Sequence, residues 1–264
     1  MKKITTLIQK EWAEVFKNKF VLFTVAFVPL IFTAIPLVAL PSIGATTEST
    51  SAFAPTDLPP QYAQLCVGLG NTECMQYFLL VQFLLLFMLI PMILPMTFAA
   101  YSIVGEKTTH TLEPLLATPI TTLELIAGKM LAAAIPGVLA TWGAYLLFIV
   151  VANFLSVSKN VLLKLNNPLW LIAIFITGPL LAIASVSIAV MVSSRTNDPR
   201  VAEQISSLFI LPLIGLFVGQ STGLIVVNQL MIIWFTIGLF FLDAGLIAFA
   251  AHFFQRENIL TRWK

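Results

Sequence analysis

Charge is what this sequence lacks most. Only 10% of its 264 residues are Asp, Glu, Lys or Arg, and 59% are hydrophobic, with a mean hydropathy of +0.97. A soluble globular protein carries roughly 25% charged residues, so the deficit excludes an ordinary soluble domain. The net charge of +2 says little, and we expect no nucleic-acid partner.

Cysteine is scarce as well. Cys66 and Cys74 are the only two cysteines, which is too few for a disulfide scaffold or for a four-ligand zinc site. Neither of the two histidines lies near them in the sequence. We therefore expect no metal site.

Long hydrophobic runs are what the sequence does have. A helix needs ~20 mainly apolar residues to cross ~30 Å of hydrocarbon, and helices are expected because lipid cannot hydrogen-bond an exposed backbone. The runs are far longer than the ~10-residue alternating segments of a membrane barrel. We predict an all-α, polytopic membrane protein with six transmembrane helices. The candidate spans are Phe20–Leu40, Gln76–Val104, Ile126–Val151, Pro168–Val192, Ile205–Val227 and Gln229–Phe253.

Two parts of this pattern have alternatives. The fifth and sixth spans are separated only by a short stretch around Gly219–Gln229, which is either a turn or a re-entrant segment. The first run could be taken for a signal peptide. Its basic leader and apolar stretch are too long, however, and no clear A-x-A site follows, so we expect it to be retained.

Lysine and arginine are divided unequally between the two sides of the membrane. One side holds 12 of the 14, and the other holds only Lys159 and Lys164. Because short basic loops stay in the cytoplasm, we predict a plasma-membrane protein with both termini cytoplasmic. The 12 are Lys2, Lys3, Lys10, Lys17, Lys19, Lys107, Lys129, Arg195, Arg200, Arg256, Arg262 and Lys264.

The loop after the first span has no lysine or arginine and contains both cysteines. Its acidic, Ser/Thr/Pro-rich composition fits the outer side of the membrane. Outside the cytoplasm, Cys66 and Cys74 can close a small disulfide-bonded loop. The alternative is two unrelated thiols.

An amphipathic pattern precedes the first span. Apolar side chains recur at helical spacing on one face, and charged side chains occupy the other. We expect a helix in the membrane interface with its lysines toward the headgroups; the alternative is a soluble helix packed on a partner. The apolar residues are Ile4, Leu7, Ile8, Trp12, Val15 and Phe16, and the charged ones are Lys3, Lys10, Glu14 and Lys17.

The segment between the second and third spans is rich in helix and turn signals. Pro114 suits the first turn of a short helix, Pro119 ends it, and Thr121 with Glu124 forms a capping box for the next span. Three leucines form an exposed apolar group, which is typical of a protein contact. The alternative is that the segment is only a capped loop that connects two helices. The leucines are Leu112, Leu115 and Leu116.

This segment resembles the signature of the ABC-2 type transporter permeases. The matching positions are Glu106-Lys107, Thr111-Leu112-Glu113, Leu115-Leu116, Pro119-Ile120, Glu124 and Gly128-Lys129. In that family the loop carries a coupling helix that docks on the ATPase subunit. The interfacial helix, the six spans and the short loop before the fifth span also agree, so the resemblance covers nearly the whole chain. It implies that the 106–119 loop couples to an ATPase through Glu106, Lys107, Thr111, Leu112, Glu113, Pro114, Leu115, Leu116 and Pro119.

No enzyme motif is found in the sequence. The P-loop pattern G-x-x-x-x-G-K-S/T is absent, because Gly128-Lys129 is followed by Met130. We expect ATP and Mg²⁺ to be bound by a separate ATPase, with no cofactor in this chain. Asp243 is the only acidic residue deep in a span. It is either a protonated or hydrogen-bonded packing residue, which we favour, or a contact for a coupling ion or substrate.

The function we expect is that of the permease subunit of an ABC exporter. A second permease copy, identical or similar, would complete a pathway in the lipid bilayer, and two cytoplasmic ATPase subunits would drive it. The alternatives are a secondary transporter driven by an ion gradient and a non-transporting assembly subunit. The predicted parts are an interfacial helix (1–19), a six-helix transmembrane domain (20–253) and a cytoplasmic tail (254–264), with an outer loop at 41–75, a coupling loop at 105–125 and a cytoplasmic loop at 193–204.

Overall fold

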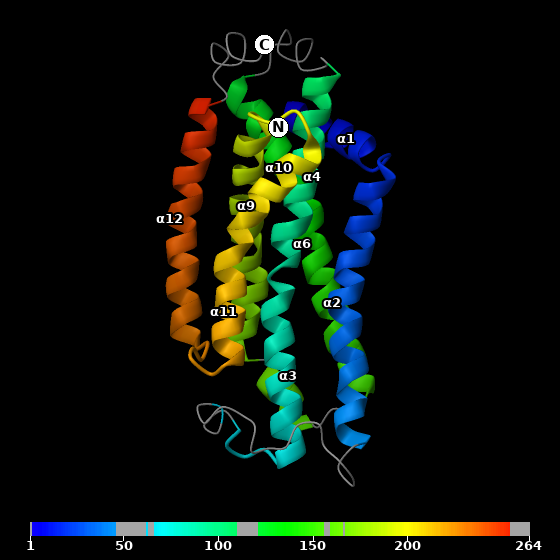
Figure 1. Cartoon of the computed structure of the whole chain (residues 1–264), viewed down its shortest axis with the longest axis vertical. Coiled ribbons are helices and arrows are strands. Elements are labelled where there is room, and N and C mark those ends of the chain that lie inside the picture. Colours follow the sequence, from blue (N-terminus) through cyan, green and yellow to red (C-terminus); the bar gives the residue numbers. More distant parts are fainter. Residues whose placement is uncertain are drawn as a thin grey trace.

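The computed structural model describes residues 2–45, 62, 66–109, 121–155, 159–165 and 167–253, and within them every regular element is a helix (Figure 1). Six helical runs are long and apolar enough to cross a membrane, which confirms the predicted all-α, polytopic fold. The elements are α1 (Lys2–Val15), α2 (Lys19–Ala45), α3 (Asn71–Phe87), α4 (Ile90–Thr108), α6 (Thr122–Phe154), α7 (Lys159–Leu165), α8 (Pro168–Ile172), the π-helical turn η3 (Ala173–Thr177), α9 (Gly178–Ser193), α10 (Pro199–Ser206), the 3-10 turn η4 (Ser207–Ile210), α11 (Leu211–Ser221) and α12 (Gln229–Phe253).

The second span, Thr72–Thr108, consists of two helices, α3 and α4. At the junction, Met88 and Leu89 each donate a backbone hydrogen bond to the carbonyl three residues earlier. This tighter winding comes just before Pro91, which has no N–H to donate and whose ring hinders a regular helix. The predicted span Gln76–Val104 is confirmed as one membrane crossing, and the structure divides it into two helices just before Pro91.

The fifth span, Pro199–Ser221, ends earlier than its predicted end at Val227. The cause is Gly223, which adopts a φ of 76° and donates its N–H to the carbonyl of Gln220 at 3.0 Å. A left-handed glycine of this kind is a common helix stop. The residues that follow connect α11 to α12 at the same end of the bundle (Figure 1), so they form a turn.

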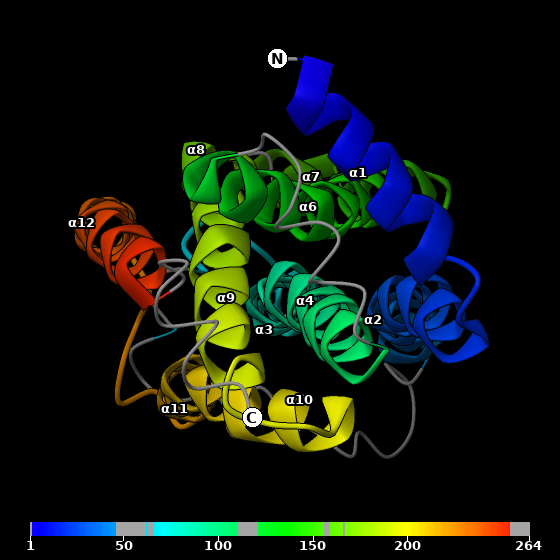
Figure 2. The ribbon, with the colours of Figure 1, turned by 90° about the horizontal axis from the view of Figure 1, so that it is seen from above.

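α4 is the central helix of the bundle. It packs against α6 and α9 (Figure 2), and most of its side chains are buried. α12 contacts mainly α9, and it stands at one edge while α2 stands at another (Figures 1 and 2). Their outward faces expose large apolar side chains such as Phe23 and Phe241. Such faces are typical of contact with lipid or with another protein.

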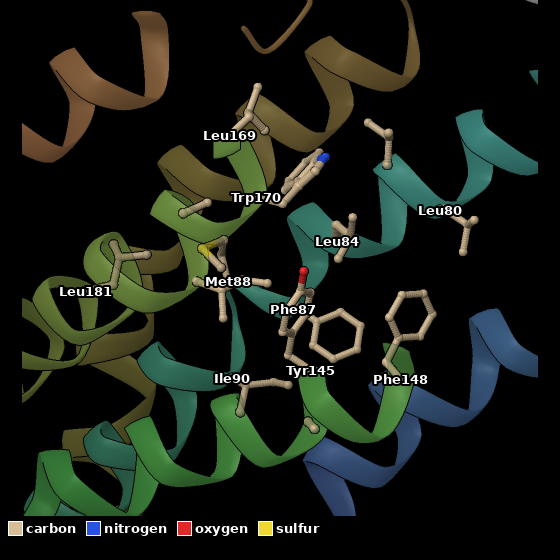
Figure 3. Close-up of a cluster of buried hydrophobic side chains, with 14 of the residues drawn as sticks. Leu80, Leu84, Phe87, Met88, Ile90, Tyr145, Phe148, Leu169, Trp170 and Leu181 are labelled. Carbon is tan, nitrogen blue, oxygen red and sulfur yellow. The ribbon is translucent and has the colours of Figure 1, made fainter. Parts of the chain in front are cut away.

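Aromatic and aliphatic side chains from α3, α4, α6, α8 and α9 fill the main core (Figure 3). The rings of Phe87 and Phe148 lie 5.5 Å apart between centroids, and both side chains are fully buried. Trp170 and Tyr145 belong to the same cluster. This close packing holds the spans at fixed positions relative to one another.

The bundle has two distinguishable ends. α1 lies across one of them, above α6 and close to the start of α2 (Figure 2). We call this the α1 end; it also contains Thr108 and Ser193. The opposite end contains Cys66, Cys74 and Thr222, and we call it the disulfide end. The predicted tail (254–264), most of the predicted outer loop and residues 110–120 lie outside the described residues.

Candidate functional site

The described parts of the coupling loop are its two ends. Glu106 and Lys107 lie in the last turn of α4, and Thr121 precedes α6. The predicted capping box is confirmed: Glu124 N donates to Thr121 Oγ1 at 3.2 Å, and Thr121 N donates to Glu124 Oε2 at 2.9 Å. The start of α6 is therefore fixed by its own sequence.

Five polar side chains meet between α1, α4 and α6. The Glu106 carboxylate pairs with Lys10 Nζ at 2.8 Å and with Lys129 Nζ at 2.6 Å. Lys129 also pairs with Glu11 at 2.8 Å, and Ser102 donates a hydrogen bond to Glu11. We call Lys10, Glu11, Ser102, Glu106 and Lys129 the buried charge cluster. It joins α1 to α4 and α6, which both lie far from α1 in the sequence.

The charges in this cluster balance, with two lysines and two glutamates. Glu11, Glu106 and Lys129 are only 3%, 4% and 7% exposed. Removing one partner from a buried ion pair leaves an uncompensated charge and costs about 3–5 kcal/mol. Lys10 is more exposed, and burial lowers its pKa, but the hydrogen bond and charge of Glu106 outweigh this and leave the pKa raised. Lys10 therefore stays charged.

α1 is attached to the bundle by packing as well as by charge. Three of its side chains are buried, and they follow one another at intervals of four residues on one face of the helix: Leu7, Glu11 and Val15. Leu7 lies against Gly128 so closely that a Cβ there would be 2.5 Å from Leu7 Cδ2. Trp12 Nε1 donates to the carbonyl of Ala132 at 2.8 Å. The apolar face of α1 thus contacts α6.

Lys107 contacts the segment between α9 and α10, whereas Glu106 contacts α1 and α6. Its Nζ donates to the carbonyl oxygens of Ser194 at 3.3 Å and Thr196 at 3.2 Å, between α9 and α10. Further along α4, Thr97 Oγ1 donates to Glu203 of α10 at 2.5 Å. α4 is therefore connected to α1 and α6 on one side and to α9 and α10 on the other.

The remaining predicted coupling residues lie outside the described residues, so their contact with an ATPase stays a prediction. They are Thr111, Leu112, Glu113, Pro114, Leu115, Leu116 and Pro119. Of the predicted set, the structure places only Glu106 and Lys107. Because Glu106 is almost fully buried, any part it has in coupling must act through its neighbours.

Asp243 lies on the face of α12 that packs against α9. It is 4% exposed, and neither carboxylate oxygen has a hydrogen-bond partner among the described residues. Two turns earlier on the same face, the hydroxyls of Thr236 and Thr177 are 2.7 Å apart. α8, η3 and α9, which contact α12, contain no basic residue. Asp243 is therefore buried without a counter-charge from these elements.

A second polar group lies at the disulfide end. Cys66 and Cys74 are joined in a disulfide with their Cα atoms 5.2 Å apart. Nearby, Tyr62 OH donates to the carbonyl of Gln220 at 2.9 Å and accepts from Gln82 Nε2 at 3.4 Å. Burial raises the pKa of Tyr62 above its usual value, so the hydroxyl keeps its proton. No group of His, Cys, Asp and Glu within the described residues could hold a metal ion.

A sequence model of the ABC-2 family of transporter proteins matches residues 5–242. This match spans nearly all the helices, from α1 to most of α12. The chain belongs to the ABC-2 transporter family. It is therefore the membrane-spanning permease of an ABC transporter, a subunit that is not itself catalytic, and the family implies partnership with an ABC ATPase and dimerisation. No curated protein matches the sequence significantly.

Four of the five residues of the permease's buried charge cluster are missing from the predicted site: Lys10, Glu11, Ser102 and Lys129. Glu11 has a signal in the sequence, because it falls on the apolar face of α1 midway between Leu7 and Val15. A lone carboxylate on an apolar face needs a buried partner. Lys129 is one of the positions that match the family signature, but its burial is not indicated, because it stands near a span boundary, where lysine commonly reaches the interface.

Proposed function

We propose that this permease is the transmembrane subunit of an ABC exporter, in which two copies form the pathway and two ATPase subunits bind at the α1 end. The observation that carries this proposal is the position of the coupling loop. Its two described ends belong to α4 and α6, and α4 is the helix at the centre of the bundle. A force applied to this loop therefore reaches the core directly.

The proposed mechanism starts on the partner subunit, which binds ATP and Mg²⁺. Closure of the ATPase dimer pushes on the segment that contains Leu115 and Leu116. Because α4 and α6 pack tightly against each other and against α9, the push reorients the spans as packed units. The substrate pathway, formed between the two permease copies, then opens toward the outer side.

We place the α1 end in the cytoplasm and the protein in the plasma membrane. Lys107, Lys129, Arg195 and Arg200 lie at the α1 end, with the basic residues of α1. Within the described residues, Lys159 and Lys164 are the basic residues at the disulfide end, where Lys164 Nζ donates to the Val67 carbonyl at 3.0 Å. A basic side that faces the cytoplasm is the usual arrangement.

The proposal is tested by purifying an affinity-tagged permease in mild detergent. An ATP-hydrolysing subunit should co-purify in equal amount. In inverted membrane vesicles, the α1 end faces the medium, so ATP should drive uptake of candidate substrates from the medium into the vesicle lumen. ATP-driven release from the lumen would instead indicate import.

One observation favours a different candidate, a secondary transporter driven by an ion gradient. Asp243 is a buried carboxylate in a span, and such residues often mark ion pathways. The same purification separates the two functions. Transport by the permease alone under an ion gradient, with no ATPase recovered, would support this candidate and reject the exporter.

A further inference from the structure

We infer that the buried charge cluster is a brace for the coupling loop, and that Glu11, Glu106 and Lys129 position that loop for docking. The inference rests on the proposed function, because docking of the ATPase is part of it. It assigns these residues a role in presenting the loop rather than in touching the partner. Glu11 and Glu106 are too deeply buried for an outside subunit to reach them.

The first part of the brace joins the two ends of the loop. Glu106 lies in the last turn of α4, and Lys129 lies in the first turns of α6. Their ion pair of 2.6 Å links the two ends across residues 110–120. The separation of the two anchor points of the loop is thus set from inside the permease, whether or not a partner is bound.

The second part of the brace is α1. Glu11 pairs with Lys129 and Lys10 pairs with Glu106, each at 2.8 Å, so consecutive residues of α1 hold opposite ends of the loop. The close approach of Leu7 to Gly128 keeps α1 seated on α6. α1, the end of α4 and the start of α6 are therefore held together as one unit at the α1 end.

The chemistry of the cluster favours a geometric role over a stabilising one. Replacing a buried ion pair by apolar side chains of similar size is often neutral or stabilising. Apolar contacts would therefore hold these helices together at least as well, but they are non-directional. Ion pairs with hydrogen-bonding geometry fix distances and directions, which is what presentation of a docking loop requires.

Two variants test the brace without leaving a buried charge unpaired. Glu106→Gln removes the charge that pairs α4 with Lys10 and Lys129. Lys129 then keeps its ion pair with Glu11, and the partly exposed Lys10 can reach solvent. Glu11→Gln removes the ion pair between α1 and Lys129, while Lys129 keeps its ion pair with Glu106. Glu14→Gln is the control, because Glu14 is an exposed charge on the same helix.

The first measurement needs no ATPase. Spin labels on cysteines introduced at Thr108, which is exposed, and Ala127, which is partly exposed, report the separation of the loop ends. We expect one narrow distance in the parent protein and in Glu14→Gln, and a broadened or shifted distance in Glu106→Gln. An unchanged distance in Glu106→Gln would overturn the brace.

The second measurement is the Kd for the ATPase subunit that co-purifies with the parent permease. We expect Glu106→Gln to raise the Kd about tenfold and Glu11→Gln to raise it less. An equal loss in Glu14→Gln would mean that the exposed charge of α1 holds the ATPase, and this would reject the inference. So would an unchanged Kd in Glu106→Gln. If the parent protein binds no ATPase, the proposed function fails, while the distance measurement still decides on the brace.

Discussion

Tyr62 donates its hydroxyl proton to the backbone carbonyl of Gln220, a residue 158 positions later, at a distance of 2.9 Å. The Tyr62 side chain is 1% exposed and packs edge-on against Phe78, with 4.7 Å between ring centroids. Ser221 completes the group by donating to Gln82 Oε1 at 3.2 Å. One loop residue therefore ties the end of α11 to α3 at the disulfide end.

Tyr62→Phe should destabilise the permease. It removes a buried hydrogen bond worth about 1 kcal/mol, which lowers the unfolding temperature of a chain of this size by about 2–4 °C. Tyr145→Phe is the matched control, because the Tyr145 hydroxyl is buried with no hydrogen-bond partner in the part of the chain that the structure describes. Its removal should leave the unfolding temperature unchanged or raise it. Equal effects in thermal unfolding would show that the Tyr62 bond contributes nothing.

The fold follows from the sequence more completely than the polar contacts do. Hydrophobic length alone predicts six spans, because each apolar run must cross the same thickness of hydrocarbon. The break before Pro91 and the stop at Gly223 depend on single residues within apolar runs, so hydropathy does not reveal them. Glu11 and Lys129 are 118 residues apart, and nothing local in the sequence predicts that they pair.

The disulfide between Cys66 and Cys74 has a direct chemical test. Protein prepared from membranes without reductant should yield proteolytic peptides linked through these two cysteines, because the loop that carries them is predicted to face an oxidising compartment. Mass spectrometry after alkylation provides the measurement. Recovery of both thiols in alkylated form would show that the bridge is absent in the cell.

The orientation of the permease can be tested by cysteine accessibility in a variant with both native cysteines replaced by serine. Thr56→Cys lies in the predicted outer loop, and Thr109→Cys follows α4 at the α1 end. A membrane-impermeant thiol reagent should label Thr56→Cys in intact cells and should label Thr109→Cys only after permeabilisation. The opposite pattern would reverse every assignment of side made above.

Asp243→Asn should be tolerated. The carboxylate is buried without a partner in the described residues, so losing its charge removes a desolvation cost without breaking a bond. We expect an equal or higher unfolding temperature. Thr236→Val is the positive control, since it removes the hydrogen bond with Thr177 on the same face of α12. A clear loss of stability in Asp243→Asn would mean that a second copy or a bound cation partners the carboxylate.

Docking of the ATPase should depend on the leucines of the coupling loop. Apolar anchors at interfaces typically cost ~2 kcal/mol or more when cut to alanine, which is roughly a thirty-fold loss of affinity. Leu115→Ala combined with Leu116→Ala should therefore weaken co-purification of the ATPase and uncouple its ATP hydrolysis from transport. Expression and membrane insertion should not change, because both leucines lie outside the predicted spans.

Two comparisons make the leucine result decisive. Leu58→Ala, in the predicted outer loop, should alter neither ATPase binding nor coupling, whereas Glu113→Lys should weaken docking if the partner offers a basic contact. The double leucine variant should also keep the narrow distance between labels at Thr108 and Ala127, because the buried charge cluster is intact in it. Loss of docking with an unchanged label distance separates contact from positioning. Full ATPase binding and coupling in the double variant would reduce the loop to a capped connector between α4 and α6.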